Sequence, residues 1–127
     1  MINITLKGEP KSTQRIYKIT CRGKFASMYM SKEGKDIKED YQWQAKSQYK
    51  GKLITEPVEI GIELYFGTKR KCDWDNFHKL SMDSLTGIVW EDDSLIQKAT
   101  IEKFYDKSNP RIELWITYLL VVNNNVI

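Results

Sequence analysis

Apolar and polar residues alternate along residues 58–66, and this is the clearest pattern in the chain. Successive side chains of a β-strand point to opposite faces, so a period of two predicts a strand with one apolar face. The apolar positions are Val58, Ile60, Ile62, Leu64 and Phe66. A shorter run of the same kind, residues 2–7, predicts a first strand that ends at Gly8-Glu9-Pro10.

Two segments carry the spacing of an amphipathic helix. Residues 35–50 place an apolar or aromatic residue at every fourth position, leave Trp43 off that stripe, and end near Gly51. A second helix is expected between Asp75, a good N-cap, and Gly87. At about 100° per residue, its buried stripe and its polar face are separate. The buried stripe holds Phe77, Leu80, Ser84 and Ile88, and the polar face holds Asp75, Lys79 and Asp83.

The remaining segments complete the expected order of elements. Residues 95–105 and 111–122 alternate between apolar and polar side chains and predict two strands joined by a turn. Residues 11–31 lack periodicity, so we expect a loop there, in which a short hairpin around Gly23 is an alternative. The order strand, loop, helix, strand, helix, strand, strand predicts a single domain over residues 1–127. Its fold class is α/β or α+β, with a mixed β-sheet flanked by two main helices. No glycine-rich loop follows a strand, which excludes a doubly wound nucleotide binder.

The distribution of charge adds a candidate function to this fold. The chain carries 20 Lys and Arg against 17 Asp and Glu, a net charge of only +3. Residues 1–35, however, hold eight basic and two acidic side chains, and a second basic group lies at 69–71. Such local excesses are typical of a surface that faces phosphate. The candidate DNA contacts are Arg15, Lys18, Arg22, Lys24, Lys69, Arg70, Lys71 and Asn76.

Cysteine use and hydropathy exclude other classes of protein. Cys21 and Cys72 are too few for a disulfide framework, and no Cys/His spacing indicates zinc, so a reduced, cytoplasmic protein is expected. The longest apolar run, residues 115–122, is far shorter than the roughly 20 residues of a membrane helix. Residues 1–6 lack the basic start and long apolar core of a signal peptide. We therefore expect no membrane association.

Carboxylates gather next to the second basic group, and their spacing predicts a metal site. Asp73 and Asp75 project to the same side of an extended segment, so both can bind one ion. Asp93 can join them because the chain returns toward the sheet after the short helix. Mg²⁺ is usually held by one or two carboxylates plus water and phosphate oxygens. Lys79, one helical turn after Asp75, can neutralise charge on a phosphate under attack, so the predicted chemistry is metal-assisted phosphodiester hydrolysis.

Each of these residues also fits a purely structural role. Asp75 fits a helix cap, and Lys79 fits an ion pair with the carboxylate four residues before or after it. Asp92 and Asp93 fit a turn that precedes a strand. His78, the only histidine, fits a packing or surface position. No single residue decides between structure and chemistry.

The combination of motifs is more informative. Residues 73–79 (DWDNFHK), 83–85 (DSL) and 91–96 (EDDSLI) together resemble the RusA family of Holliday junction resolvases. The hallmark of that family reads roughly D-x-D-N-x-x-K, then D-x-L, then D-D-x-x-V/I. Residues 8–15, with Pro10 and a following Arg15, are similar to the early turn of the family.

The resemblance implies a magnesium-dependent endonuclease, with Mn²⁺ able to substitute, that acts as a symmetric homodimer on four-way branched DNA. Such enzymes are often encoded by phages and prophages, so the expected setting is the cytoplasm of a bacterial or phage-infected cell. Carried over by position, the catalytic residues are Asp73, Asp75, Lys79 and Asp93. The implied metal ligands are Asp73, Asp75 and Asp93, with Asp92 as an accessory candidate.

Two other functions stay open at this point. One is a branched-DNA binding protein without cleavage activity, and the other is a general metal-dependent nuclease without junction preference. The complete set of three aspartates and one lysine favours junction cleavage. A dimer would have a mass of about 30 kDa, twice the 15.0 kDa of the chain. We expect its interface to be apolar and to include the final strand and the aromatic-rich segment 11–31, with the basic segments on the DNA-facing side.

Overall fold

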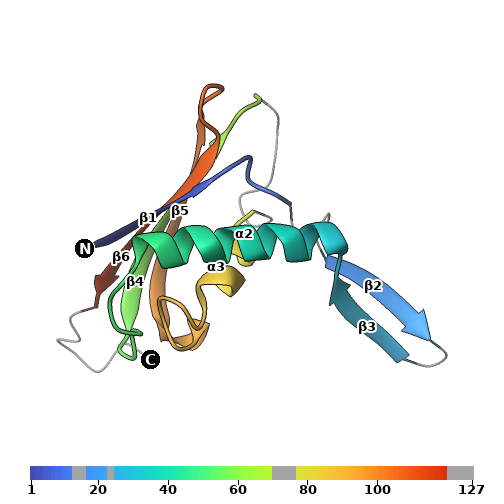
Figure 1. The fold of residues 1–127 in the computed structure, drawn as a ribbon, viewed down its shortest axis with the longest axis horizontal. Coiled ribbons are helices and arrows are strands. Elements are labelled where there is room, and N and C mark those ends of the chain that lie inside the picture. Colours follow the sequence, from blue (N-terminus) through green and yellow to red (C-terminus); the bar gives the residue numbers. More distant parts are fainter. Residues whose placement is uncertain (13–16, 23–24, 70–76, 120–127) are drawn as a thin grey trace.

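The computed structural model describes residues 1–12, 17–22, 25–69 and 77–119, of which 17–22 and 25–28 are described by their backbone. At its centre lies a four-stranded sheet with the order β1-β6-β4-β5 (Figure 1). The strands are β1 (Ile2–Lys7), β4 (Val58–Phe66), β5 (Ile96–Tyr105) and β6 (Arg111–Tyr118). β4 pairs with β5 in parallel, and β6 pairs antiparallel with both β1 and β4. The mixed sheet and the α+β class expected from the sequence are confirmed.

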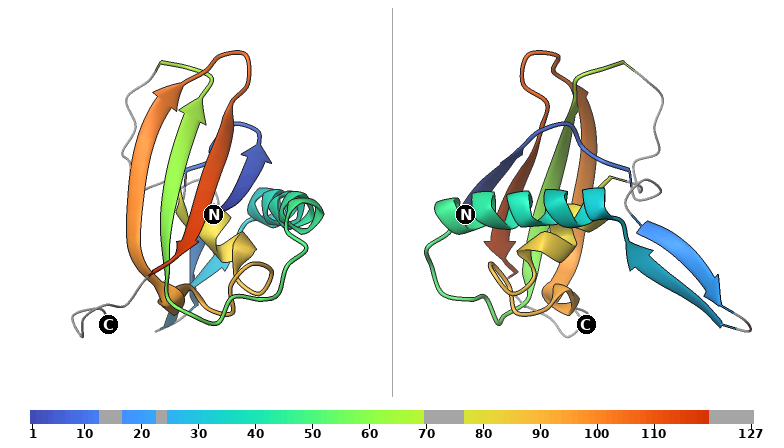
Figure 2. Two further views of the ribbon diagram at one scale, coloured as in Figure 1. Left: turned by 90° about the vertical axis from the view of Figure 1, so that its left-hand side faces the viewer. Right: turned by 45° about the vertical axis from the view of Figure 1, so that its right-hand side comes forward.

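Helices α2 (Lys32–Gln48) and α3 (Lys79–Leu85) both pack on one face of this sheet (Figure 2). Alternate strand residues point toward the helices and form the core with residues from both helices. Among them are Ile4, Leu6, Tyr41, Ala45, Ile60, Leu64, Leu80, Leu85, Ile112 and Leu114. Burial, with a smaller contribution from the charge of Asp40, raises the pKa of Tyr41 to about 12. No helix in the described part of the chain is long and apolar enough to span a membrane.

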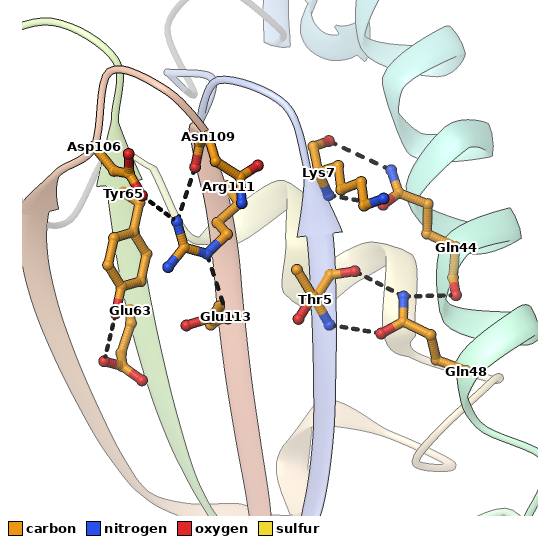
Figure 3. A network of polar contacts seen from close by, with 10 residues as sticks. All are labelled: Thr5, Lys7, Gln44, Gln48, Glu63, Tyr65, Asp106, Asn109, Arg111 and Glu113. Atoms are coloured by element: carbon orange, nitrogen blue, oxygen red, sulfur yellow. Dashed lines mark hydrogen bonds and ion pairs between the residues drawn. The ribbon is translucent and has the colours of Figure 1, made fainter.

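Two glutamine side chains of α2 bond the outer edge of β1 (Figure 3). Gln48 accepts from the Thr5 amide at 2.8 Å and donates to the Thr5 carbonyl at 2.7 Å. Gln44 accepts from the Lys7 amide at 2.7 Å and donates to the Lys7 carbonyl at 3.4 Å. Gln44 and Gln48 lie four residues apart on the helix, a rise of about 6 Å, and Thr5 and Lys7 lie two residues apart on the strand, a rise of about 6.8 Å. Because these spacings are similar, each glutamine can reach one of the two strand residues. The amide and carbonyl groups of Thr5 and Lys7 on this edge of the sheet are therefore satisfied by α2.

The most periodic segments were predicted most accurately. The strands at 2–7 and 58–66 have the expected boundaries. The helix expected at 35–50 spans 32–48, because Ser31 caps it: the Gly34 amide donates to Ser31 Oγ at 3.1 Å. Trp43, off the predicted stripe, is 75% exposed.

Three predictions differ from the structure. Segment 11–31 is not only a loop: β2 (Tyr17–Arg22) and β3 (Phe25–Met30) form an antiparallel hairpin, which projects from the body beside the start of α2 (Figure 1). The second helix begins only at Lys79, with His78 at the N-cap position instead of Asp75. The last strand ends at Tyr118, short of the predicted residue 122.

Candidate active site

A pocket of about 480 Å³ opens between α3, the short 3₁₀ helix η2 (Asp93–Leu95), β4 and β5. Its floor is apolar because the alternation of β4 and β5 turns their aliphatic residues toward the helix side. Its rim carries the polar groups of α3 and η2. The lining residues are Ile60, Ile62, His78, Lys79, Met82, Asp83, Asp93, Ile96, Ala99 and Ile101.

Lys79 and Asp83 form an ion pair on the rim of this pocket. Lys79 Nζ lies 3.2 Å from Asp83 Oδ2, one turn further along α3. The side chains are 47% and 27% exposed, and a pair that exposed adds at most about 1 kcal/mol to stability. Both residues line the pocket. The spacing of these two residues on one helix face, expected from the sequence, is confirmed.

Asp93 reaches the same pocket from the far end of the connection between β4 and β5. It opens η2, directly before β5, and its side chain lines the pocket with Lys79 and Asp83. Asp92 is not among the lining residues: its Oδ2 accepts a hydrogen bond from Ser94 Oγ at 2.6 Å. That bond holds the pKa of the Asp92 carboxyl below its ordinary value.

The donors on the rim are of the type that a hard divalent cation prefers. Asp83 and Asp93 supply carboxylate oxygens, which suit Mg²⁺. Within the described ranges, no group of three or more His, Cys, Asp or Glu side chains is placed to hold a metal ion. The predicted ligands Asp73 and Asp75 lie outside those ranges.

The structure describes only part of the predicted DNA surface. Lys69 Nζ lies 5.0 Å from the centre of the Tyr105 ring, at the end of β5. Lys18 and Arg22 belong to β2 of the projecting hairpin. Arg15, Lys24, Arg70, Lys71 and Asn76 lie outside the described residues.

Sequence reasoning did not select three features of the pocket. Asp83 was recognised only as a residue on the polar face, and His78 as a packing or surface position, whereas both line the pocket. The i,i+4 spacing of Lys79 and Asp83 was a signal for the first of these. The aliphatic floor gives no local signal, because its residues come from two strands that pair only in the folded sheet.

Comparison with known proteins agrees with the motif pattern. The family model described as "Endodeoxyribonuclease RusA" matches residues 7–117. The chain is also 30% identical over 109 residues to the protein named "Crossover junction endodeoxyribonuclease rusA" from Enterobacteria phage 82. That similarity covers 85% of this chain and 88% of the relative.

Proposed function

Because the chain belongs to the RusA endodeoxyribonuclease family, we propose that it resolves Holliday junctions by paired, symmetric nicks that depend on a divalent metal ion, Mg²⁺ with Mn²⁺ able to substitute. The named function of the phage 82 relative, a crossover junction endodeoxyribonuclease, supports this substrate. Two symmetric nicks require two sites, so we propose that the protein acts as a homodimer.

One observation supports the location of the chemistry. Lys79, near the middle of the connection between β4 and β5 (residues 67–95), and Asp93, near the end of that connection, line the same pocket. A cation and a carboxylate brought together from distant positions form a site at which a phosphate and a metal ion can be held side by side. Both residues belong to the motifs that carry the family resemblance.

We assign the metal to Asp73, Asp75 and Asp93, with Asp92 as an accessory ligand. When bound, the ion would polarise the scissile phosphate and lower the pKa of an attacking water. Lys79 would balance the negative charge that gathers on the phosphate, and Asp83 would position the Lys79 ammonium through their 3.2 Å ion pair.

A cleavage assay tests this proposal. Purified protein is incubated with a labelled four-way junction, and separately with linear duplexes of the same sequences, in Mg²⁺, Mn²⁺ or EDTA. We expect paired nicks in the junction alone, with either metal, and none in EDTA. Binding without cutting under all conditions would identify a junction-binding protein instead, and equal cutting of linear duplex would identify a general nuclease.

A further inference from the structure

Among the described residues, the two edges of the sheet differ in the partners of their outer backbone groups. The outer edge of β1 is bonded by Gln44 and Gln48 (Figure 3). β5 forms the opposite edge, and across the described ranges no strand pairs with its outer side. It is ten residues long, and residues 98–100 and 102–105 are exposed. An open edge of this length is a template for pairing with another strand, and proteins usually cover or interrupt it.

The side chains of β5 divide between two faces. Lys98 Nζ lies 3.5 Å from Glu59 Oε2, and the Phe104 ring stacks on Tyr65 at 4.9 Å, so both point away from the helices. Glu102 shares that face by alternation. Ala99 and Ile101 point to the helix side, where they line the pocket.

Charge and apolar residues on β5 are self-complementary in one register. If two copies of β5 run antiparallel about a two-fold axis at Thr100, the residue numbers that face each other add to 200. Lys98 then faces the partner's Glu102, and Ala99 faces the partner's Ile101. An axis at Lys98 or at Glu102 would instead place like charges opposite each other, which is unfavourable.

Glu102 also lies in a row of like charge. In the sheet register it is beside Glu63, which is itself opposite Glu113. The hydroxyl of Tyr65 donates to Glu63 at 3.1 Å, but that bond adds no positive charge. Arg111 Nε lies 3.3 Å from Glu113 Oε1 at one end of this row, and the partner's Lys98 would bring a cation to the other end, at Glu102.

We infer that two copies of this chain pair through β5, antiparallel and about an axis at Thr100, into one eight-stranded sheet. This inference deepens the proposed function, since it names the surface that joins the two sites of a resolvase. It differs from the interface expected from the sequence, which included the final strand. Both backbone edges of β6 are paired, with β1 and β4, so β6 offers no open edge to a second copy.

The symmetry of this pairing places both pockets on the same side. A two-fold axis perpendicular to the sheet keeps the helix-covered faces of the two copies together. Ala99 and Ile101, which line the pocket, adjoin the partner strand, and the partner's Lys103 lies opposite Gln97, a few residues after Asp93. The second copy therefore borders each catalytic pocket.

The area of this interface limits its affinity. A single pair of edge strands buries less surface than a standard interface of about 800 Å² per partner, so we expect a dissociation constant on the order of micromolar.

Disulfide cross-linking of variants with one introduced cysteine tests the register of the two β5 strands directly. Residues directly opposite in an antiparallel pair have Cα atoms about 4.5–5.5 Å apart, within disulfide range. Thr100→Cys should therefore give a covalent dimer under mild oxidation at tens of micromolar. Lys98→Cys and Glu102→Cys alone should not, because each lies about 13 Å along the strand from its own copy. A mixture of those two variants should cross-link, and wild type measures the background from Cys21 and Cys72.

Other outcomes would overturn the inference. Cross-linking of Lys98→Cys or Glu102→Cys alone would show another register. A species of about 30 kDa, twice the 15.0 kDa chain mass, with no cross-linking of Thr100→Cys would place the interface elsewhere. None of these measurements uses nuclease activity, so a Thr100→Cys dimer that fails to cut junctions would reject the proposed function and retain the interface.

A charge exchange gives an independent test. Lys98→Glu and Glu102→Lys should each weaken dimerisation in sedimentation by about tenfold, because each change enters the symmetric interface twice. The double variant should recover wild-type affinity. Glu59→Gln, which removes the intrachain partner of Lys98, is the matched control and should leave dimerisation unchanged. Failure of the double variant to recover, with normal circular dichroism, would contradict the pairing.

Discussion

Asp92 and Asp93 are adjacent in the chain, but their carboxylates have different surroundings. Asp92 is engaged by the hydroxyl of Ser94, at 2.6 Å, whereas Asp93 lines the pocket that also holds Lys79. Because only one of them faces the pocket, the two neighbours differ in what they can contribute to a ligand there.

Asparagine substitutions separate these roles. Asp93→Asn keeps the size of the side chain and removes its charge, so we expect junction cleavage to fall by orders of magnitude while junction binding persists or tightens. Asp92→Asn, the matched control, should lose less. Cleavage is measured at saturating protein, and binding by gel shift in EDTA. An equal loss in both variants would show that both carboxylates face the metal.

Substitutions of Lys79 distinguish chemistry from helix stability. Lys79→Met removes the charge over the pocket and should abolish cleavage, whereas Lys79→Arg keeps the charge and should be partly active. Because the exposed pair with Asp83 contributes at most about 1 kcal/mol, both variants should fold normally by circular dichroism. Near-normal cleavage by Lys79→Met would reduce Lys79 to a surface partner of Asp83.

At the scale of single elements, Gly61 shows a constraint on β4. It lies at the centre of the strand, on the face away from the helices, and is paired with Trp115 of β6. A Cβ atom at Gly61 would overlap the indole ring of Trp115. The glycine therefore lets a large aromatic side chain lie flat against the sheet.

Gly61→Ala should destabilise the protein by about 1–3 kcal/mol, because the Trp115 ring must move. Urea unfolding measures this cost. In a Trp115→Ala background the ring is absent, so the same glycine substitution should cost much less, and the difference is the coupling energy of the pair. Equal costs in the two backgrounds would mean that the indole can move freely.

The accuracy of the sequence predictions followed the strength of the local pattern. Nine residues of unbroken alternation fixed the limits of β4. Segment 11–31 mixes basic, hydroxyl and aromatic residues without a period. Its hairpin, in which β2 pairs with β3, was therefore predicted only as a possible short hairpin around Gly23. The start of α3 was misplaced because Asp75 is a good cap by residue type, whereas the helix begins after His78, whose side chain makes no cap bond.

The candidate site was partly predictable for a similar reason. Lys79 and Asp83 share a helix face, which spacing alone indicates. Asp93 was expected at the site because the chain returns toward the sheet after the short helix, and the family motif supported that expectation. The aliphatic floor of Ile60 and Ile101, in contrast, depends on parallel pairing of β4 with β5. Such contacts join residues that are far apart in the sequence, so rules based on local spacing do not predict them.

At the scale of the whole molecule, the hairpin β2–β3 projects beyond the start of α2, away from β4 and β5, which form the floor of the pocket (Figure 1). Lys18 and Arg22 belong to that hairpin, whereas Lys46 lies in the last turn of α2. If the hairpin contacts DNA, phosphate binding and cleavage depend on different elements.

Salt dependence tests that division. Junction affinity should fall steeply with salt as counterions are released, with a slope of about 0.9 in log–log form for each phosphate neutralised. Lys18→Ala with Arg22→Ala should reduce the slope by about two and weaken binding, and Lys46→Ala, the control, should not change it. Fluorescence anisotropy between low and physiological salt gives the slopes. An unchanged slope in the double variant would remove the hairpin from the DNA surface.

The parallel pairing of β4 with β5 also governs when the site can form. Parallel neighbours cannot be joined by a tight turn, so the long connection 67–95 must close before they pair, at a cost in chain entropy. Lys79, Asp83 and Asp93 all lie within that connection. A nascent chain that has emerged only as far as residue 95 carries every predicted catalytic side chain but lacks the strand that completes their pocket. The pocket that these side chains line therefore forms only after β5 has been synthesised.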